Sequence, residues 1–157
     1  MITDARNYYK PFEYQTAFDF YKDQHRAHWL ADEVPLASDL NDWKLKLTEP
    51  EKSLIGNILK SFAQTEVHVN DYWSTKVSVW FPKPEIQAMA RVFADFESIH
   101  AEAYARLNEE LGLDDFAAFM EDETSKNKIE RPPTVLLKIF VVLFRIRNYS
   151  FCFSNST

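Results

Sequence analysis

Apolar side chains recur along this chain at the alternating three- and four-residue spacing of amphipathic helices. The most regular stripe consists of Ile86, Ala90, Phe93, Glu97, His100, Tyr104, Leu107 and Leu111. Residues at this spacing share one face, so the pattern predicts a long helix that starts at Glu85 and ends near Gly112, a natural C-terminal cap. On its buried face, Glu97, His100 and Tyr104 place a carboxylate, an imidazole and a phenol where apolar groups are expected.

A second stripe of this kind lies upstream, and it also contains a carboxylate. Thr48 is the predicted N-cap of its helix, because Glu51 follows three residues later as in a capping box and Pro50 falls in the first turn. The inward positions are Ile55, Leu59, Phe62, Glu66, Val69 and Trp73. If the two helices pack antiparallel, Glu66 faces Glu97, and like charges packed together need a cation, a shared proton or a basic partner.

The remaining segments also favour helices, which predicts an all-α fold in a single domain over residues 1–157. Few breakers interrupt the chain, which has only two glycines. The expected elements are a helix over 14–29, a long loop over 30–46, a short helix over 114–123, a polar loop over 124–131 and a buried helix over 135–144. Residues 145–157 fit none of these patterns and form an atypical end, which suggests a truncated or frame-altered sequence.

Composition excludes several classes of function. The net charge of −6 comes without a basic run, which argues against direct nucleic-acid binding. One cysteine, Cys152, rules out an internal disulfide framework and a cysteine-rich zinc site. The first ten residues lack the core of a signal peptide, and the most apolar stretch is too short to span a bilayer. We therefore expect a cytoplasmic protein without membrane contact.

The pair Glu97–His100 is a candidate metal-binding pair, since carboxylate and imidazole together suit iron, manganese or zinc. Glu66 strengthens this interpretation by offering a third ligand from the neighbouring helix. The alternative is that these groups are solvated on helix surfaces, with the register of Glu66 slipped by one. His68 and Asp71 are competing ligands on the Glu66 helix and rank lower because they leave its stripe. Tyr104 and Trp29 each have a simpler explanation as packing residues.

Three segments carry a resemblance to a known family. Residues 96–104 (FESIHAEAY) resemble the metal-and-tyrosyl motif of the small, radical-generating subunit of class I ribonucleotide reductase. Residues 29–39 (WLADEVPLASD) resemble its tryptophan segment, and residues 61–67 (SFAQTEV) resemble the helix that gives its first ligand. All three agree with the family in order and spacing over roughly residues 15 to 144.

The resemblance implies a ferritin-like helical bundle with a dinuclear iron or manganese–iron site. By position, Glu66, Glu97 and His100 would be metal ligands, and Tyr104 would bear a radical. Trp29 would lie on the route that passes the radical to a large subunit, which reduces ribonucleotides to deoxyribonucleotides. The implied partners are that large subunit and a second copy of the small one.

The sequence departs from the family in two ways. Many members have aspartate where this chain has Glu66, and relatives with glutamate there use manganese and iron but usually lack the tyrosine. The family also needs three further ligands, and Arg145, Arg147 and Asn148 stand where the next glutamate is expected. We therefore expect the chain to be an N-terminal part of the subunit, inactive alone, with weak metal binding and no stable tyrosyl radical in an EPR spectrum after addition of ferrous iron and oxygen.

Two other functions stay open from the residues alone. One is another ferritin-like carboxylate protein, such as an oxidase or an iron-binding protein, which would share the Glu-x-x-His pair. The other is a non-enzymatic helical interaction protein whose polar stripe positions face solvent. Glu97→Ala separates this last function from the metalloproteins, because it should abolish metal uptake only where Glu97 is a ligand.

Overall fold

The computed structural model describes residues 1–113 and 115–129, and all regular structure over those residues is helical. The predicted all-α fold class is therefore confirmed for this part of the chain. In order along the sequence the elements are α1 (Gln15–Arg26), η1 (Ala31–Glu33), α2 (Ala37–Leu45), α3 (Glu49–Asp71), η2 (Tyr72–Val77), α4 (Ser78–Trp80), α5 (Pro84–Glu110), α6 (Phe116–Glu121) and α7 (Glu123–Ile129).

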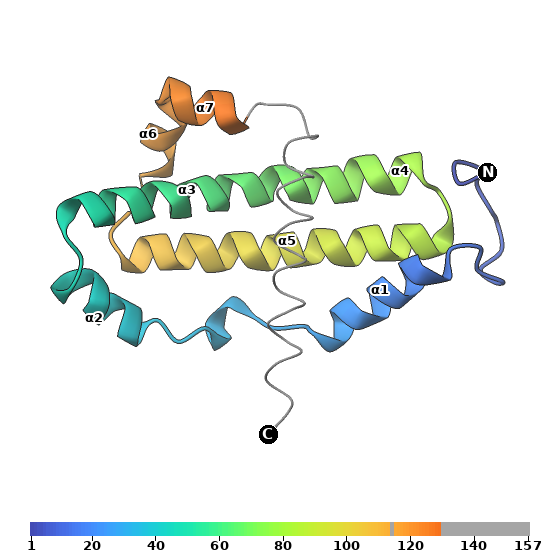
Figure 1. The fold of residues 1–157 in the computed structure, drawn as a ribbon. Coiled ribbons are helices and arrows are strands. Elements are labelled where there is room, and N and C mark those ends of the chain that lie inside the picture. The colour runs from blue at the N-terminus through green and yellow to red at the C-terminus, as the bar shows by residue number, and fades with distance from the viewer. Residues whose placement is uncertain (114, 130–157) are drawn as a thin grey trace.

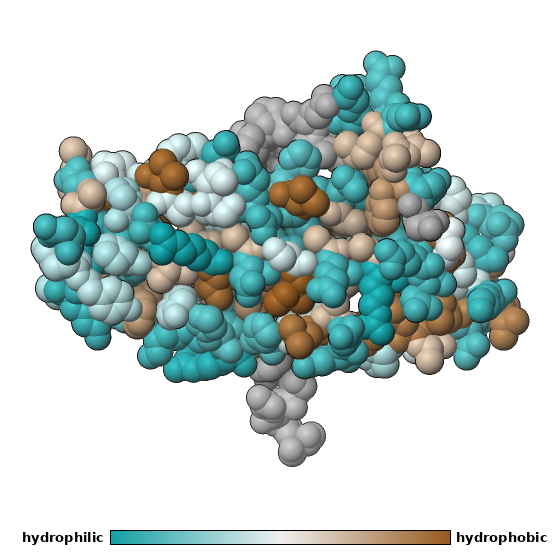
Figure 2. Space-filling view, turned by 180° about the vertical axis from the view of Figure 1, so that it is seen from behind, coloured by the Kyte–Doolittle hydropathy of each residue, from teal (hydrophilic) through white to brown (hydrophobic). Residues whose placement is uncertain are grey.

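Two long helices form the centre of the molecule. Helices α3 and α5 run antiparallel and side by side, with η2 and α4 continuing the line of α3 (Figure 1). Helix α1 packs along α5, and α7 contacts α3. This arrangement brings the apolar stripe of α3 against the stripe of α5, as the antiparallel prediction requires. On the face in Figure 2, some apolar side chains reach the surface among mostly hydrophilic ones.

Helix α3 begins where the capping box predicts. The backbone N–H of Thr48 donates to Glu51 Oε2 at 2.8 Å, and the Thr48 hydroxyl donates to the same oxygen at 2.6 Å. These hydrogen bonds lower the pKa of the Glu51 carboxyl. Pro50 lies in the first turn, where the helix needs no N–H donor.

Helix α5 ends with a Schellman motif. Gly112 has a φ of 71° and its N–H donates to Glu109 O at 3.0 Å, while the N–H of Leu113 donates to Asn108 O at 2.8 Å. The reversed chain then lays Leu113 on Gly56 of α3, where an added Cβ would lie 3.0 Å from Leu113 Cδ1. The glycine thus lets the end of α5 approach α3 closely.

The sequence prediction is wrong for two loops. Residues 30–46 contain η1 and α2, where Leu40 and Trp43 are half-buried at helical spacing in an otherwise exposed helix. Residues 123–129 form α7, although 124–131 was expected to be a loop. The apolar signal in both segments is too weak to predict helices without their tertiary contacts. The expected helix over 135–144 and the atypical end over 145–157 lie outside the described residues.

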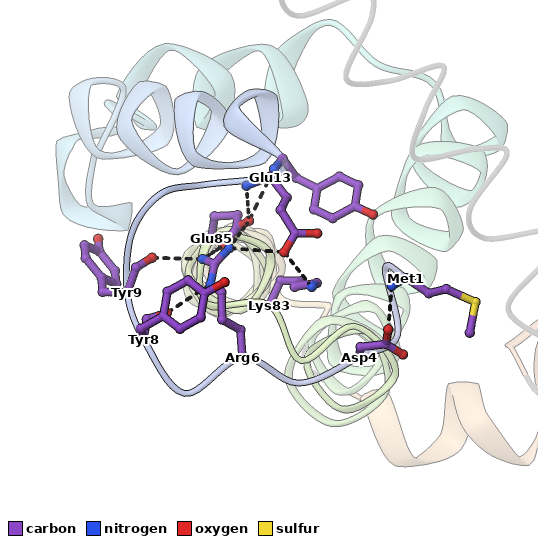
Figure 3. Close-up of polar contacts among 9 residues, drawn as sticks. Met1, Asp4, Arg6, Tyr8, Tyr9, Glu13, Lys83 and Glu85 are labelled. Carbon is purple, nitrogen blue, oxygen red and sulfur yellow. Dashed lines mark hydrogen bonds and ion pairs between the residues drawn. The ribbon is translucent and has the colours of Figure 1, made fainter.

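A buried ion pair fixes the N-terminal segment to the start of α5. Glu85 has no exposed surface, and its Oε2 lies 2.5 Å from Arg6 Nη2 (Figure 3). The backbone N–H groups of Glu13 and Tyr14 donate to Glu85 Oε1 at 3.0 and 3.2 Å. Burial acts to raise the pKa of Glu85, but the hydrogen bonds outweigh it and the pKa is lowered. Nearby, Lys83 Nζ donates to Glu13 Oε1 at 2.8 Å.

Arg6→Ala should destabilise the protein strongly, because it leaves the charge of Glu85 buried without its cation. Breaking a buried pair in this way costs roughly 3 to 5 kcal/mol. Urea titration followed by circular dichroism measures the change in the free energy of unfolding. The control is Arg26→Ala, whose ion pair with Asp23 is exposed on both sides and should contribute less than about 1 kcal/mol. Equal effects of the two substitutions would contradict the structural role of Arg6.

Candidate metal centre

Three potential ligands converge between the two central helices. Glu97 and His100 lie one turn apart on α5, and Glu66 comes from the facing turn of α3. One ligand atom of each residue lies within 4.8 Å of the ligand atoms of the other two. The structure therefore brings together the residues that the two sequence stripes indicated.

The cluster is largely removed from solvent. The Glu97 side chain is 1% exposed and the His100 side chain 17%, and Glu66 is half-buried. His100 Nδ1 lies 3.0 Å from Glu97 Oε2, which fixes the orientation of both side chains. The alternative of a solvated pair on the surface of the helix is therefore wrong for Glu97.

The electrostatics of the cluster favour a bound cation. Burial, a hydrogen bond with Glu97 and the charge of Glu97 raise the pKa of Glu66 to about 8, although His100 acts to lower it. Without a metal, the two carboxylates hold a proton between them at neutral pH. A divalent cation would replace this proton and satisfy both carboxylates and the imidazole. The donor set thus fits iron or manganese.

Trp29 lies beside His100, one member of the cluster. It falls after the end of α1, and its ring centroid is 5.9 Å from that of His100. Arg106 of α5 holds the following segment in place, because its Nη1 donates to Ala31 O at 2.8 Å and contacts Asp32. No pattern in the sequence distinguishes Arg106 from an ordinary surface arginine, so sequence analysis missed it.

Tyr104 lies one turn beyond His100 and is half-buried. Its ring centroid is 5.4 Å from that of Phe62 on α3, so the phenol is on the side of α5 that faces the second ligand helix. The backbone carbonyl of Tyr104 accepts a hydrogen bond of 2.7 Å from the fully buried amide of Asn108. The predicted stripe therefore continues through this residue.

Asn70 is a second residue that sequence analysis missed. It lies one turn after Glu66, and its Nδ2 donates to Ala94 O at 2.6 Å and to Ser98 Oγ at 2.9 Å on α5. These bonds fix the register of the two ligand helices next to the site. The competing ligands His68 and Asp71 are exposed, as their lower rank predicted.

Two carboxylates and an imidazole between long antiparallel helices indicate a class of protein, the helical bundle with a candidate carboxylate-rich metal site. Residues 6–137 match the family described as ribonucleotide reductase, small chain. The chain belongs to this family, and its all-α fold is the ferritin-like fold of these proteins. The resemblance drawn from the three sequence motifs is confirmed.

Curated relatives carry the name of this reductase. The chain is 36% identical over 129 residues to the probable ribonucleoside-diphosphate reductase small subunit 376L of Invertebrate iridescent virus 6, covering 81% of this chain and 36% of that protein. It is 29% identical over 119 residues to the small subunit of Dictyostelium discoideum, covering 76% of this chain and 33% of the relative. The chain thus spans about a third of the length of these relatives. Among the described helices, none is long and apolar enough to cross a membrane.

The shared proton makes the stability of the metal-free protein depend on pH. The pKa of Glu66 is about 8 in the folded state against 4.5 for an ordinary glutamate, so the folded state binds a proton that the unfolded state releases. This contribution is complete below pH 4.5 and is lost as the pH rises through about 8. Urea titrations in the presence of a chelator should show this decline. Glu66→Gln should flatten it, whereas Glu102→Gln, at an exposed position of α5, should not.

Proposed function

We propose that this chain is part of the radical-generating small subunit of a ribonucleoside-diphosphate reductase, with Glu66, Glu97 and His100 as metal ligands. The observation that supports this most directly is the buried carboxylate of Glu97 next to a second carboxylate and an imidazole. Membership of the small-chain family supports the same assignment. It also favours this function over an unrelated oxidase or an iron-binding protein.

The described residues have distinct roles in the proposed reaction. With O₂, a bound iron pair or manganese–iron pair would supply the oxidising power needed to remove an electron from a nearby phenol. Tyr104 gives up that electron and releases its phenolic proton to water, which reaches the half-buried side chain. The ring of Phe62 lies 5.4 Å from the ring that then carries the radical. Trp29, in ring contact with His100, relays an electron between this site and a large subunit. That partner reduces ribonucleotides.

The domain organisation, the partners and the location that the family implies form part of the same proposal. The chain belongs to one ferritin-like domain that includes residues 1–157. The complete small subunit pairs with a second copy of itself and with the large subunit, and it works in the cytoplasm. Deoxynucleotide synthesis is the process it serves.

Metal binding tests the ligand assignment directly. Titration with Mn²⁺, followed by loss of the EPR signal of the free ion, should show binding by the unchanged chain. Glu97→Gln should weaken binding at least about tenfold, a loss of about 1.4 kcal/mol, because it removes a charged ligand. Glu102→Gln is the matched control, since it removes the same charge from an exposed position of the same helix. Unchanged affinity in Glu97→Gln would rule out the proposed site.

The position of Trp29 gives an independent test. Co²⁺ bound beside His100 should quench the fluorescence of Trp29, because the two rings are 5.9 Å apart. The quenched fraction should therefore fall in Trp29→Phe. Trp43→Phe is the control, since Trp43 lies on α2 outside the aromatic cluster around Phe93 and Phe96. Equal quenching in Trp29→Phe and the unchanged protein would contradict the relay position.

A further inference from the structure

Three oxidisable side chains form a line from the core to the surface at the junction of α3, η2 and α4. The ring centroids of Trp73 and Tyr72 are 5.4 Å apart, and those of Tyr72 and Trp80 are 6.1 Å apart. Trp73 and Tyr72 are partly buried and pack on the core of Val77, Ile86 and Ala90, whereas Trp80 is 51% exposed. The line therefore begins in the interior and ends in solvent.

The inner end of this line approaches the candidate metal centre. Trp73 follows Glu66 by seven residues on the same stripe, a rise of about 10 Å along a helix. Its ring centroid is 4.9 Å from that of Phe93, which precedes Glu97 by one turn of α5. Phe93 belongs to a small core against which Trp29 also packs.

The local backbone accounts for the spacing of the outer pair. Residues Tyr72–Val77 form the π-helix η2, which takes up more residues per turn than an α-helix. Because of the wider turn, Trp80 lies on the same side of the helix as Tyr72, although it follows eight residues later. The two rings are therefore in contact. Short π segments inside α-helices are frequent at functional sites.

We propose that Trp73, Tyr72 and Trp80 form an electron-transfer chain by which a soluble reductant returns electrons from the protein surface to the oxidised interior. The proposal rests on the redox metal site proposed above. Trp73 and Tyr72 pack on the core, and Trp80, which is 51% exposed among the described residues, gives the line an end that solvent reaches. A soluble reductant can reduce a radical on Trp80 only if the Trp80 side chain is exposed to solvent.

The electron count of the proposed chain balances at each step. Trp73 would give one electron to an oxidised iron or manganese ion held by the proposed ligands, which would lower the oxidation state of that ion by one. Tyr72 then reduces Trp73 and releases its phenolic proton to water, which reaches it because the side chain is only partly buried. Trp80 reduces the Tyr72 radical, which takes a proton back from water. This step is uphill and is drawn forward by rapid reduction of the Trp80 radical at the surface. At the surface, a one-electron reductant such as a thiolate or ascorbate reduces the Trp80 radical and is itself oxidised.

The chain can be tested without any metal. Azide radicals made by pulse radiolysis oxidise tryptophan selectively, and transient absorbance then follows conversion of indolyl radicals to tyrosyl radicals. This conversion runs the outer step in reverse, from Tyr72 to Trp80, and so measures electron transfer across the same ring contact in its downhill direction. The metal-free protein should show a conversion phase whose rate does not depend on protein concentration. Tyr72→Phe and Trp80→Phe should each lose most of this phase. The controls Tyr8→Phe and Trp43→Phe should keep it, since Tyr8 is exposed in the N-terminal segment and Trp43 lies on α2.

Electron transfer between Tyr72 and Trp73 needs a separate measurement. In a Trp80→Phe background, the residual conversion should fall further with Trp73→Phe but not with Trp43→Phe. Absence of the phase from the unchanged protein, or its persistence in Tyr72→Phe, would overturn the proposal. No metal takes part, so failure here leaves the ligand assignment intact. Conversely, a Mn²⁺ titration that ruled out the proposed ligands would not change the expected conversion of indolyl to tyrosyl radicals.

Discussion

The structure depends on one electrostatic constraint, the burial of the Glu97 carboxylate beside a second carboxylate between α3 and α5. A charge in such a position is costly unless it is paired. In the absence of a metal the cost is reduced by protonation, as the raised pKa of Glu66 shows. A divalent cation removes the repulsion without adding a proton, and His100 completes a donor set suited to it. The same constraint therefore explains both the titration of Glu66 and the choice of ligands.

Such a cluster works only if the two helices cannot slide, and the fold fixes them at three levels. The Schellman turn at Gly112 brings Leu113 onto Gly56 at one end. Next to the ligands, Asn70 bonds to the backbone of α5. At the other end, Gln87 of α5 donates to Ser78 O of α4, which continues the line of α3. A shift of one residue would carry Glu97 away from Glu66, because the ligand face is a single stripe.

Sequence alone predicted the features that depend on local periodicity or on a cap. The stripes placed Glu66, Glu97 and His100 on facing surfaces, and Thr48 and Gly112 marked helix ends that the structure confirms. Features that depend on distant contacts were missed. Arg106 reaches the segment after Trp29, and Arg6 reaches Glu85, 79 residues further along the chain, without any signal in the surrounding sequence. The π turn was missed for a related reason, since the apolar spacing through Trp73 fits an α-helix equally well and the wider turn depends on packing against α5.

The dryness that makes the cluster suitable for a metal also limits how it can be reduced. Glu97 is 1% exposed and His100 17% exposed, so a soluble reductant has little direct access to an ion held by these two residues, and transfer through neighbouring rings offers an alternative. Trp29 offers one route, because its ring meets His100 directly. The line through Trp73 and Tyr72 leads instead to Trp80, on the connection between the two central helices. Under the proposed function, two separate routes would allow one to serve a large subunit while the other discharges oxidising equivalents that the large subunit does not take up. The exposure of the Trp80 indole is then connected to the burial of Glu97, because a buried redox site needs a path of side chains to the surface.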